Sequence, residues 1–295
     1  MTSRPAVNFR AVLPLLALAL SALALVAARP TALRAQGVLV APQAVFMNHR
    51  TRSGAIELYN PGAEPVEVSV STLFGYPVTD SSGVTTLYTA GAPEPAEPSA
   101  AAWVMAFPRR LTLAPGQRQT VRLLARPPQD LADGEYWTRL VVEAGGGRVD
   151  LAGPPGDSSA IQVGLVLKVR TVIALLYRKG GVSTGVALSN LRATVVGDSM
   201  AVRMRLAREG NAAYLGQVHA TLRDARGREA RSFAAPMAVY HALEPRYTLP
   251  VSGLAPGRYT LDLRVDTHRD DISAAGVLPG PAVRDTVSVV VPARR

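Results

Sequence analysis

The sequence contains no cysteine, which excludes disulfides and thiolate metal sites, so burial alone must hold the fold together. Aromatic residues make up 5% of the 295 residues, and any core must therefore be built mainly from valine, leucine and alanine. Lysine occurs twice, as Lys168 and Lys179, and arginine supplies nearly all of the positive charge. Hydrophobic residues nevertheless reach 48%, enough for two cores of ordinary size.

The basic charge is scattered and does not form a patch. Part of the formal net charge of +10 comes from the first 35 residues, which hold four arginines and no acid. The remaining basic residues alternate with acids and form no dense run, so we do not expect a nucleic-acid partner.

Residues 1–35 have the pattern of an export signal. A basic start with Arg4 and Arg10 precedes an uncharged apolar run over 11–26, and Ala35 offers a small residue for cleavage. The alternative is an uncleaved anchor, for which the run is slightly short. Both interpretations place the rest of the chain outside the cytoplasm.

From Gly37 onward the pattern is that of an all-β protein. Short β-rich runs alternate with turn residues, and no stretch has sustained helical periodicity. This spacing predicts antiparallel, immunoglobulin-like β-sandwiches. The expected strands include 54–59, 66–72, 119–125, 136–143, 163–177, 199–206, 217–224, 258–266 and 285–291.

An internal repeat predicts two sandwich domains. The pattern L-x-x-G-x-Y occurs at 131–136 and again at 254–259, about one domain length apart, each time before an alternating strand. In sandwich domains a tyrosine at such a turn often bonds back to upstream backbone, forming a tyrosine corner. With Gly180-Gly181 as the hinge, we expect one domain over 36–178 and a second over 180–295.

Two low-complexity stretches interrupt the strands. Residues 90–102 are rich in proline, alanine and glutamate, and residues 145–159 are rich in glycine and proline. Neither holds enough apolar residues to offset the entropy of ordering, so both are expected to be mobile surface loops.

The sequence offers little catalytic chemistry. It has no G-x-S-x-G elbow, phosphate loop, dinucleotide fingerprint or H-E-x-x-H pair, and its four histidines are far apart. Residues 266–271 (DTHRDD) could hold a metal, but such a run after a strand is more often a solvated turn. We therefore expect neither an enzyme nor a cofactor or metal site.

The longest expected strand, 163–177 (VGLVLKVRTVIALLY), allows two interpretations. Its apolar positions, which include Leu165, Leu167 and Val169, alternate on one side, with Lys168 and Arg170 opposite. This side could face the domain's own core, or it could be offered to a partner that lacks a strand. In the second case, Lys168 and Arg170 would guard an open edge against aggregation.

Four segments of residues 37–178 follow one another in a recognisable order. These segments are Gln43-Ala-Val-Phe46 with Ile56-Glu-Leu58 and Asn60; Pro108 to Leu113 with Ala114-Pro-Gly-Gln117 and Val121-Arg-Leu123; Asp133-Gly-Glu-Tyr-Trp137; and Leu176-Tyr-Arg178. Each is weak alone, but in this order and spacing they resemble the periplasmic pilus-assembly chaperones, the PapD-like family. The region after 180 looks like a generic immunoglobulin or fibronectin type III module.

The resemblance implies a periplasmic, non-enzymatic chaperone that binds pilin-like or other surface subunits by strand addition (donor-strand complementation). Leu165, Leu167 and Val169 would be the donated side chains, and an outer-membrane usher could be a further partner. The resemblance also implies a charge network between the two domains through Glu135 and Arg178, to which Asp266 could belong. It implies no nucleotide, cofactor or small-molecule substrate.

Two positions depart from the family pattern. The family anchors the subunit's C-terminal carboxylate with an arginine and a lysine, and Gln43 and Ala174 stand in those places here. Gln43, Lys168 and Arg170 remain possible auxiliary binding residues. This departure leaves open an alternative, a structural or interaction module of a cell-envelope assembly without a chaperone cycle.

Overall fold

A computed structural model describes residues 37–151 and 163–293 of the chain. The regular elements in these ranges are strands, apart from one turn of 3₁₀ helix, η1 (Ala274–Gly276). The predicted all-β class with antiparallel sandwiches is therefore confirmed. No helix in the described ranges is long and apolar enough to span a bilayer. The signal peptide predicted for residues 1–35 lies outside them.

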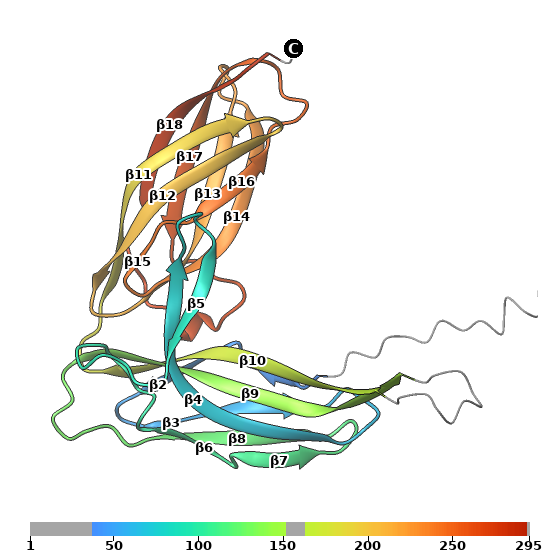
Figure 1. Cartoon of the computed structure of the whole chain (residues 1–295). Coiled ribbons are helices and arrows are strands. Elements are labelled where there is room, and N and C mark those ends of the chain that lie inside the picture. The colour runs from blue at the N-terminus through green and yellow to red at the C-terminus, as the bar shows by residue number, and fades with distance from the viewer. Residues whose placement is uncertain (1–36, 152–162, 294–295) are drawn as a thin grey trace, which may run out of the picture. The chain divides into compact units, whose positions relative to one another are not determined.

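Strands β1–β10 form the first sandwich, whose two sheets have the orders β1-β3-β8-β6 and β2-β10-β9-β4-β5, with β7 also paired to β4 (Figure 1). Its strands are β1 (Leu39–Ala41), β2 (Ala44–Asn48), β3 (Ser53–Tyr59), β4 (Val66–Thr79), β5 (Thr85–Ala90), β6 (Val104–Phe107), β7 (Arg110–Leu113), β8 (Arg118–Ala125), β9 (Gly134–Leu151) and β10 (Val163–Lys179).

Strands β11–β18 form the second sandwich, with sheets ordered β11-β12-β15 and β14-β13-β17-β18 and with β16 also paired to β12. Its strands are β11 (Thr184–Val196), β12 (Ser199–Gly210), β13 (Tyr214–Arg223), β14 (Glu229–Val239), β15 (Ala242–Leu243), β16 (Arg246–Pro250), β17 (Gly257–Asp266) and β18 (Val283–Val291). Both sandwiches lie in one compact unit, and the division into two domains at Gly180-Gly181 stays a prediction.

Each sandwich has a core of aliphatic side chains from both of its sheets. Ile56 and Val121 of one sheet meet Leu140 and Leu175 of the other in the first core, and all four are almost fully buried. In the second core, Val202 of one sheet and Leu261 of the other are likewise buried. Aliphatic side chains such as valine and leucine therefore fill both cores, as the low aromatic content predicts.

A third buried cluster joins the two sandwiches and contains much of the aromatic content. It includes Phe74, Trp137 and Leu176 from the first sandwich and Leu215 and Tyr240 from the second. The rings of Trp137 and Tyr240 meet edge to face, with centroids 4.7 Å apart. Apolar burial therefore holds the two sandwiches against each other as well as closing each one.

The two tyrosine corners predicted from the repeat are confirmed. The hydroxyl of Tyr136 donates to the carbonyl of Ala132, and that of Tyr259 donates to the carbonyl of Ala255, each at 2.9 Å. Each tyrosine therefore ties the start of its strand to the turn before it.

The predicted surface loop at 145–159 is wrong over residues 145–151, whereas the one at 90–102 is a surface loop that is buried only near its end. Residues 145–151 continue β9 and pair with β10 as far as Val163, so backbone pairing orders a glycine-rich stretch that has few apolar side chains. In the other stretch, Ala100 is fully buried, and its amide donates to the carbonyl of Trp137 at 2.8 Å. The remainder of the second predicted loop, 152–159, lies outside the described residues.

Tyr214 of the second sandwich is a buried residue whose hydroxyl has no hydrogen-bond partner among the described residues. Burial, with a smaller contribution from the charge of Asp266, raises the pKa of Tyr214 to about 12. Because this folded-state pKa exceeds the ordinary value of 10.0, the stabilisation is complete below pH 10 and is lost as the pH rises through 12.

We expect Tyr214→Phe to be as stable as the parent at pH 8 or more stable by up to about 1 kcal/mol, since it removes an unsatisfied buried hydroxyl. Between pH 10 and 12 the variant should lose about 2 kcal/mol less unfolding free energy than the parent. Urea unfolding across this pH range measures both effects. Tyr88→Phe, at an exposed tyrosine, is the control. The prediction would be contradicted if Tyr214→Phe lost as much unfolding free energy between pH 10 and 12 as the parent.

Candidate functional site

Strand β10 has one edge that its own sheet does not cover along most of its length. It pairs antiparallel with β9 from Val163 to Lys179. On its other edge it pairs in parallel with β2, and only from Ala174 to Arg178. In residues 37–151 and 163–293, no strand pairs with that edge of β10 between 163 and 173. Backbone donors and acceptors along this segment are therefore open to an added strand. Figure 1 shows β10 beside β9 in this sheet.

The core-facing side chains of β10 become less buried from the end of the strand toward its start. Tyr177, Leu175 and Ile173 are buried in the first core, whereas Val169, four residues earlier on the same side, is half-buried. The start of the described chain passes nearby, since a side chain at Gly37 would meet Val169 at 3.8 Å. The backbones of Leu165 and Leu167 lie on the open segment, but their side chains are outside the described part.

Lys168 and Arg170, the predicted guards, are both exposed on the opposite side of β10. The Arg170 guanidinium lies 3.5 Å from the carboxylate of Glu143 on β9, and both side chains are about half exposed. An exposed pair of this kind contributes little to stability. Both cations thus stay accessible beside the open edge.

Gln43 and Ala174, the positions that depart from the family pattern, line one cavity of about 220 Å³. They come together because β2 starts at Ala44, which pairs directly with Ala174. Arg170, which could have replaced the missing anchor, does not line this cavity and pairs with Glu143 instead.

Two arginines that line this cavity, Arg139 and Arg269, were not recognised as site residues from the sequence. Arg269 makes a two-pronged ion pair with Asp271, with both contacts at 2.6 Å. Arg139 is more than nine-tenths buried; its Nε donates to the carbonyl of Gly75 at 2.9 Å, and its Nη2 has no partner among the described residues. The sequence signal for Arg139 was its place within the apolar run of β9, where buried residues are expected and a charged side chain is unusual.

Glu135 and Arg178, the predicted charge network, are paired at 2.7 Å on neighbouring strands β9 and β10. The Glu135 side chain is fully buried and also accepts a hydrogen bond from the indole Nε1 of Trp137 at 3.0 Å. A third bond comes from the second sandwich, where the amide of Ala213 donates to the same carboxylate at 2.9 Å. This carboxylate therefore ties the two sandwiches together.

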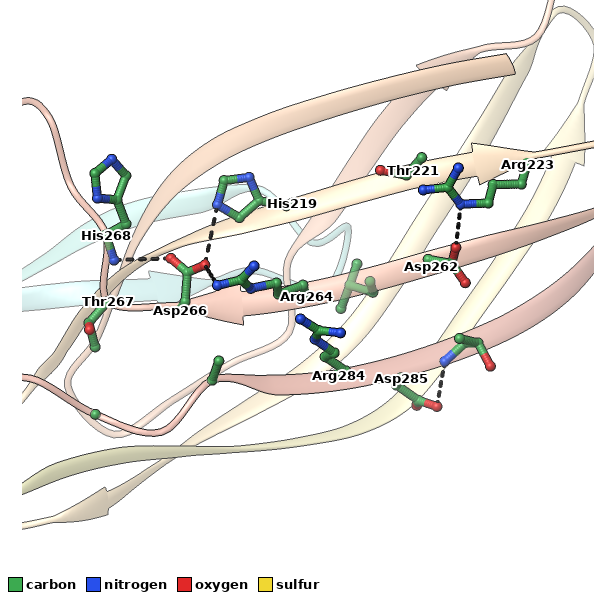
Figure 2. A pocket seen from close by; sticks show the side chains of 14 residues that line it. His219, Thr221, Arg223, Asp262, Arg264, Asp266, Thr267, His268, Arg284 and Asp285 are labelled. Atoms are coloured by element: carbon green, nitrogen blue, oxygen red, sulfur yellow. Dashed lines mark hydrogen bonds and ion pairs between the residues drawn. The ribbon is translucent and has the colours of Figure 1, made fainter. Parts of the chain in front are cut away.

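Asp266, the possible third member of this network, pairs elsewhere. Its carboxylate lies 3.0 Å from Arg264 and 3.7 Å from His219, at one end of an open hollow of about 1190 Å³ on the second sandwich. Figure 2 shows these side chains on neighbouring strands, with Arg223 and Asp262 forming a separate pair further along. The backbone amide of Ala213 takes the place expected for Asp266 at Glu135.

The 266–271 segment forms local ion pairs. His268 lies 3.0 Å from Asp270, and Arg269 pairs with Asp271. No group of three or more potential ligands is placed to hold a metal ion among residues 37–151 and 163–293. His268 and Asp270 are exposed as in a solvated turn, but the Arg269 side chain is 11% exposed and also donates to the carbonyl of Met237 at 3.0 Å.

Comparisons with known proteins give similarity in structure without a match in sequence. No family model matches the chain, and no curated protein matches it. A structure of the SafB chaperone with the SafA pilin of Salmonella enterica covers 85% of this chain and 97% of that chain, at 14% identity and a TM-score of 0.42. The YadV chaperone covers 85% and 99% at 15% identity and a TM-score of 0.41. The Pseudomonas aeruginosa CupB2 chaperone covers 86% and 100% at 12% identity and a TM-score of 0.39.

Proposed function

We propose that this chain is an exported chaperone that binds pilin-like or other surface subunits by lending them strand β10. The observation that carries the proposal is the uncovered edge of β10 between Val163 and Ile173. A subunit that lacks one strand has an apolar groove and unpaired backbone groups, and an extended donor strand satisfies both. The resemblance of residues 37–178 to pilus chaperones supports the same function.

Binding of this kind needs no cofactor or chemical step. Leu165, Leu167 and Val169 would each contribute about 1.5–3 kcal/mol on burial, roughly 5–9 kcal/mol together before ordering costs. Each backbone hydrogen bond would add about 0.5–1.5 kcal/mol. The side-chain and backbone contributions together act against an association cost of about 4–15 kcal/mol, so both are needed for a stable complex. The proposed role is non-enzymatic.

The proposed location is the periplasm, with an outer-membrane usher as a further partner. The support is the export pattern of residues 1–35 and the sequence resemblance. Lys168 and Arg170 beside the open edge would keep it from pairing with other chains before a subunit arrives.

The second candidate is an interaction module of an envelope assembly that has no chaperone cycle. It is favoured by Gln43 and Ala174, which place an amide and a methyl group at the two positions where the family pattern has an arginine and a lysine. The cations of this cavity are instead Arg139 and Arg269, and Arg269 is already paired with Asp271. Such a module would keep its partner permanently, whereas a chaperone would release the subunit to an usher.

Hydrogen exchange on a complex tests strand addition directly. The chain would be expressed with a pilin-like subunit that lacks one strand, and amide exchange would be compared with that of the chain alone. We expect the outward-facing amides of 163–173 to exchange at least about tenfold more slowly in the complex than in the chain alone, because an added strand would bond to them. Strand β5 at the opposite edge of the sheet is the internal control and should be unchanged. A stable complex without protection on β10 would exclude donation by this strand.

A further inference from the structure

The hairpin formed by β4 and β5 carries a tip, residues 79–84, whose shape is set by its own hydrogen bonds. The Asp80 carboxylate accepts bonds from the amides of Ser82 and Val84 at 2.8 and 2.9 Å. It also accepts the Ser82 hydroxyl at 2.6 Å, and these bonds lower the pKa of Asp80 below its ordinary value. The tip is therefore preformed before it meets any other part of the chain.

This tip contacts the second sandwich through three hydrogen bonds. The amide of Arg246 donates to the carbonyl of Gly83 at 2.9 Å, and the amide of Glu244 donates to Oγ1 of Thr79 at 2.8 Å. The third bond runs from the Arg203 guanidinium to the carbonyl of Ser82 at 3.0 Å. Two backbone amides of the second sandwich thus have their partners on a loop of the first.

Gly83 is suited to this contact in two respects. Its φ of +87° lies in the left-handed region that favours glycine. A side chain there would also lie 2.6 Å from Cβ of Arg246 and 2.9 Å from its amide nitrogen. No other residue at position 83 could keep both the turn and the contact.

Aromatic packing continues the contact at the base of the hairpin. The ring of Tyr76 on β4 stacks on Tyr240, with centroids 6.5 Å apart, and meets His241 edge to face at 4.7 Å. Glu97 lies 3.1 Å from His241 and accepts a bond from the Tyr76 hydroxyl at 3.3 Å. The hairpin therefore touches the second sandwich from its base to its tip.

We propose that residues 79–84 are a releasable strap that fixes the angle between the two sandwiches. The bonds that Thr79 and Ser82 make to the second sandwich are exposed, whereas Gly83, the Glu135 carboxylate and the third cluster are buried. Surface contacts of this kind open far more often than buried ones. When the strap opens, the second sandwich pivots on the buried joint at Glu135.

A pivot of this kind changes the cavity that contains Gln43. Arg139 and Ala174 of the first sandwich and Leu215 and Ile272 of the second line it together. Its width therefore depends on the angle that the strap holds. This inference does not rest on the proposed chaperone function, because it concerns the chain alone.

The absence of cysteine allows a direct test with spin labels. Thr120→Cys on β8 and Thr286→Cys on β18, both exposed, place one label on each sandwich. Pulsed electron paramagnetic resonance should give a narrow distance distribution for the parent and one about twofold broader for Gly83→Ala, as expected for loosely held domains. The control is Gly253→Ala. Gly253 has a similar positive φ (+76°) but open space for a side chain, so the distance distribution of this variant should stay narrow.

A second variant separates strap release from misfolding at Gly83. The double variant Thr79→Val, Arg203→Met removes two of the three bonds and leaves the glycine in place. It should also broaden the distribution and raise the exchange rate of the Arg246 amide about tenfold. A parent distribution that is already broad, or variants as narrow as Gly253→Ala, would overturn the proposal.

Discussion

Replacing Leu165 and Leu167 together with aspartate should reduce recovery of a co-expressed pilin-like subunit at least about a hundredfold, if β10 is the donated strand. Two aliphatic side chains that become buried in a groove contribute about 3–6 kcal/mol, and each 1.4 kcal/mol is a factor of ten in affinity. Aspartate also places a charge where the subunit offers apolar surface, which adds to the loss. Co-purification from periplasm with a tag on this chain measures the effect.

Two control variants make this result specific to β10. Leu39→Asp changes a leucine that is 61% exposed on edge strand β1 of the other sheet, and it should leave recovery unchanged. Gln43→Ala should also have little effect, because an uncharged amide cannot supply the family's carboxylate anchor. Recovery of folded subunit at parental levels with both aspartates present would reject strand donation through these side chains. A strong loss with Gln43→Ala would instead place a binding contact at Gln43.

Glu135→Ala should have the largest effect on stability, about 3–5 kcal/mol of unfolding free energy. The variant leaves Arg178, which is 14% exposed, without its carboxylate, and an uncompensated buried charge has a cost of this size. The indole of Trp137 and the amide of Ala213 lose the same acceptor. Urea unfolding followed by tryptophan fluorescence reports the change, since Trp137 lies at the site.

The matched comparison is Glu57→Ala, which removes an exposed ion pair of 2.6 Å with Arg118. We expect it to lose less than about 1 kcal/mol, because surface pairs are screened by solvent. Glu135→Gln keeps an acceptor oxygen but removes the charge, and it should lose about 1–3 kcal/mol. Equal losses in Glu135→Ala and Glu57→Ala would show that the buried network does not hold the two sandwiches together.

Part of the candidate site could be predicted from local sequence. The alternation in 163–177 predicts β10, and the L-x-x-G-x-Y repeat predicts both tyrosine corners, because strands and turns depend on neighbouring residues. The pairing of Glu135 with Arg178 was reached by resemblance, since no local pattern links residues 43 positions apart.

Other features were missed because they depend on segments distant in the sequence. The glycine-rich stretch 145–151 looks disordered by composition, yet pairing with β10 orders it. The sequence alone gives no reason for a buried arginine at 139. In the structure, the Arg139 guanidinium lies over the ring of Tyr240 of the second sandwich, 4.9 Å from the ring centroid. Asp266 was a plausible partner for Glu135, but the strand register places it beside Arg264 and His219.

The sequence by itself determined the all-β class, most strand positions and the turns at Gly134 and Gly257, because alternation and turn chemistry act over a few residues. Only the tertiary structure decided which edge of β10 stays open, since that depends on where β2 stops pairing at Ala174. It also decided that a backbone amide rather than Asp266 completes the Glu135 network. Both outcomes depend on how two sheets from separate parts of the chain pack together, and side-chain patterns along one strand do not encode that packing.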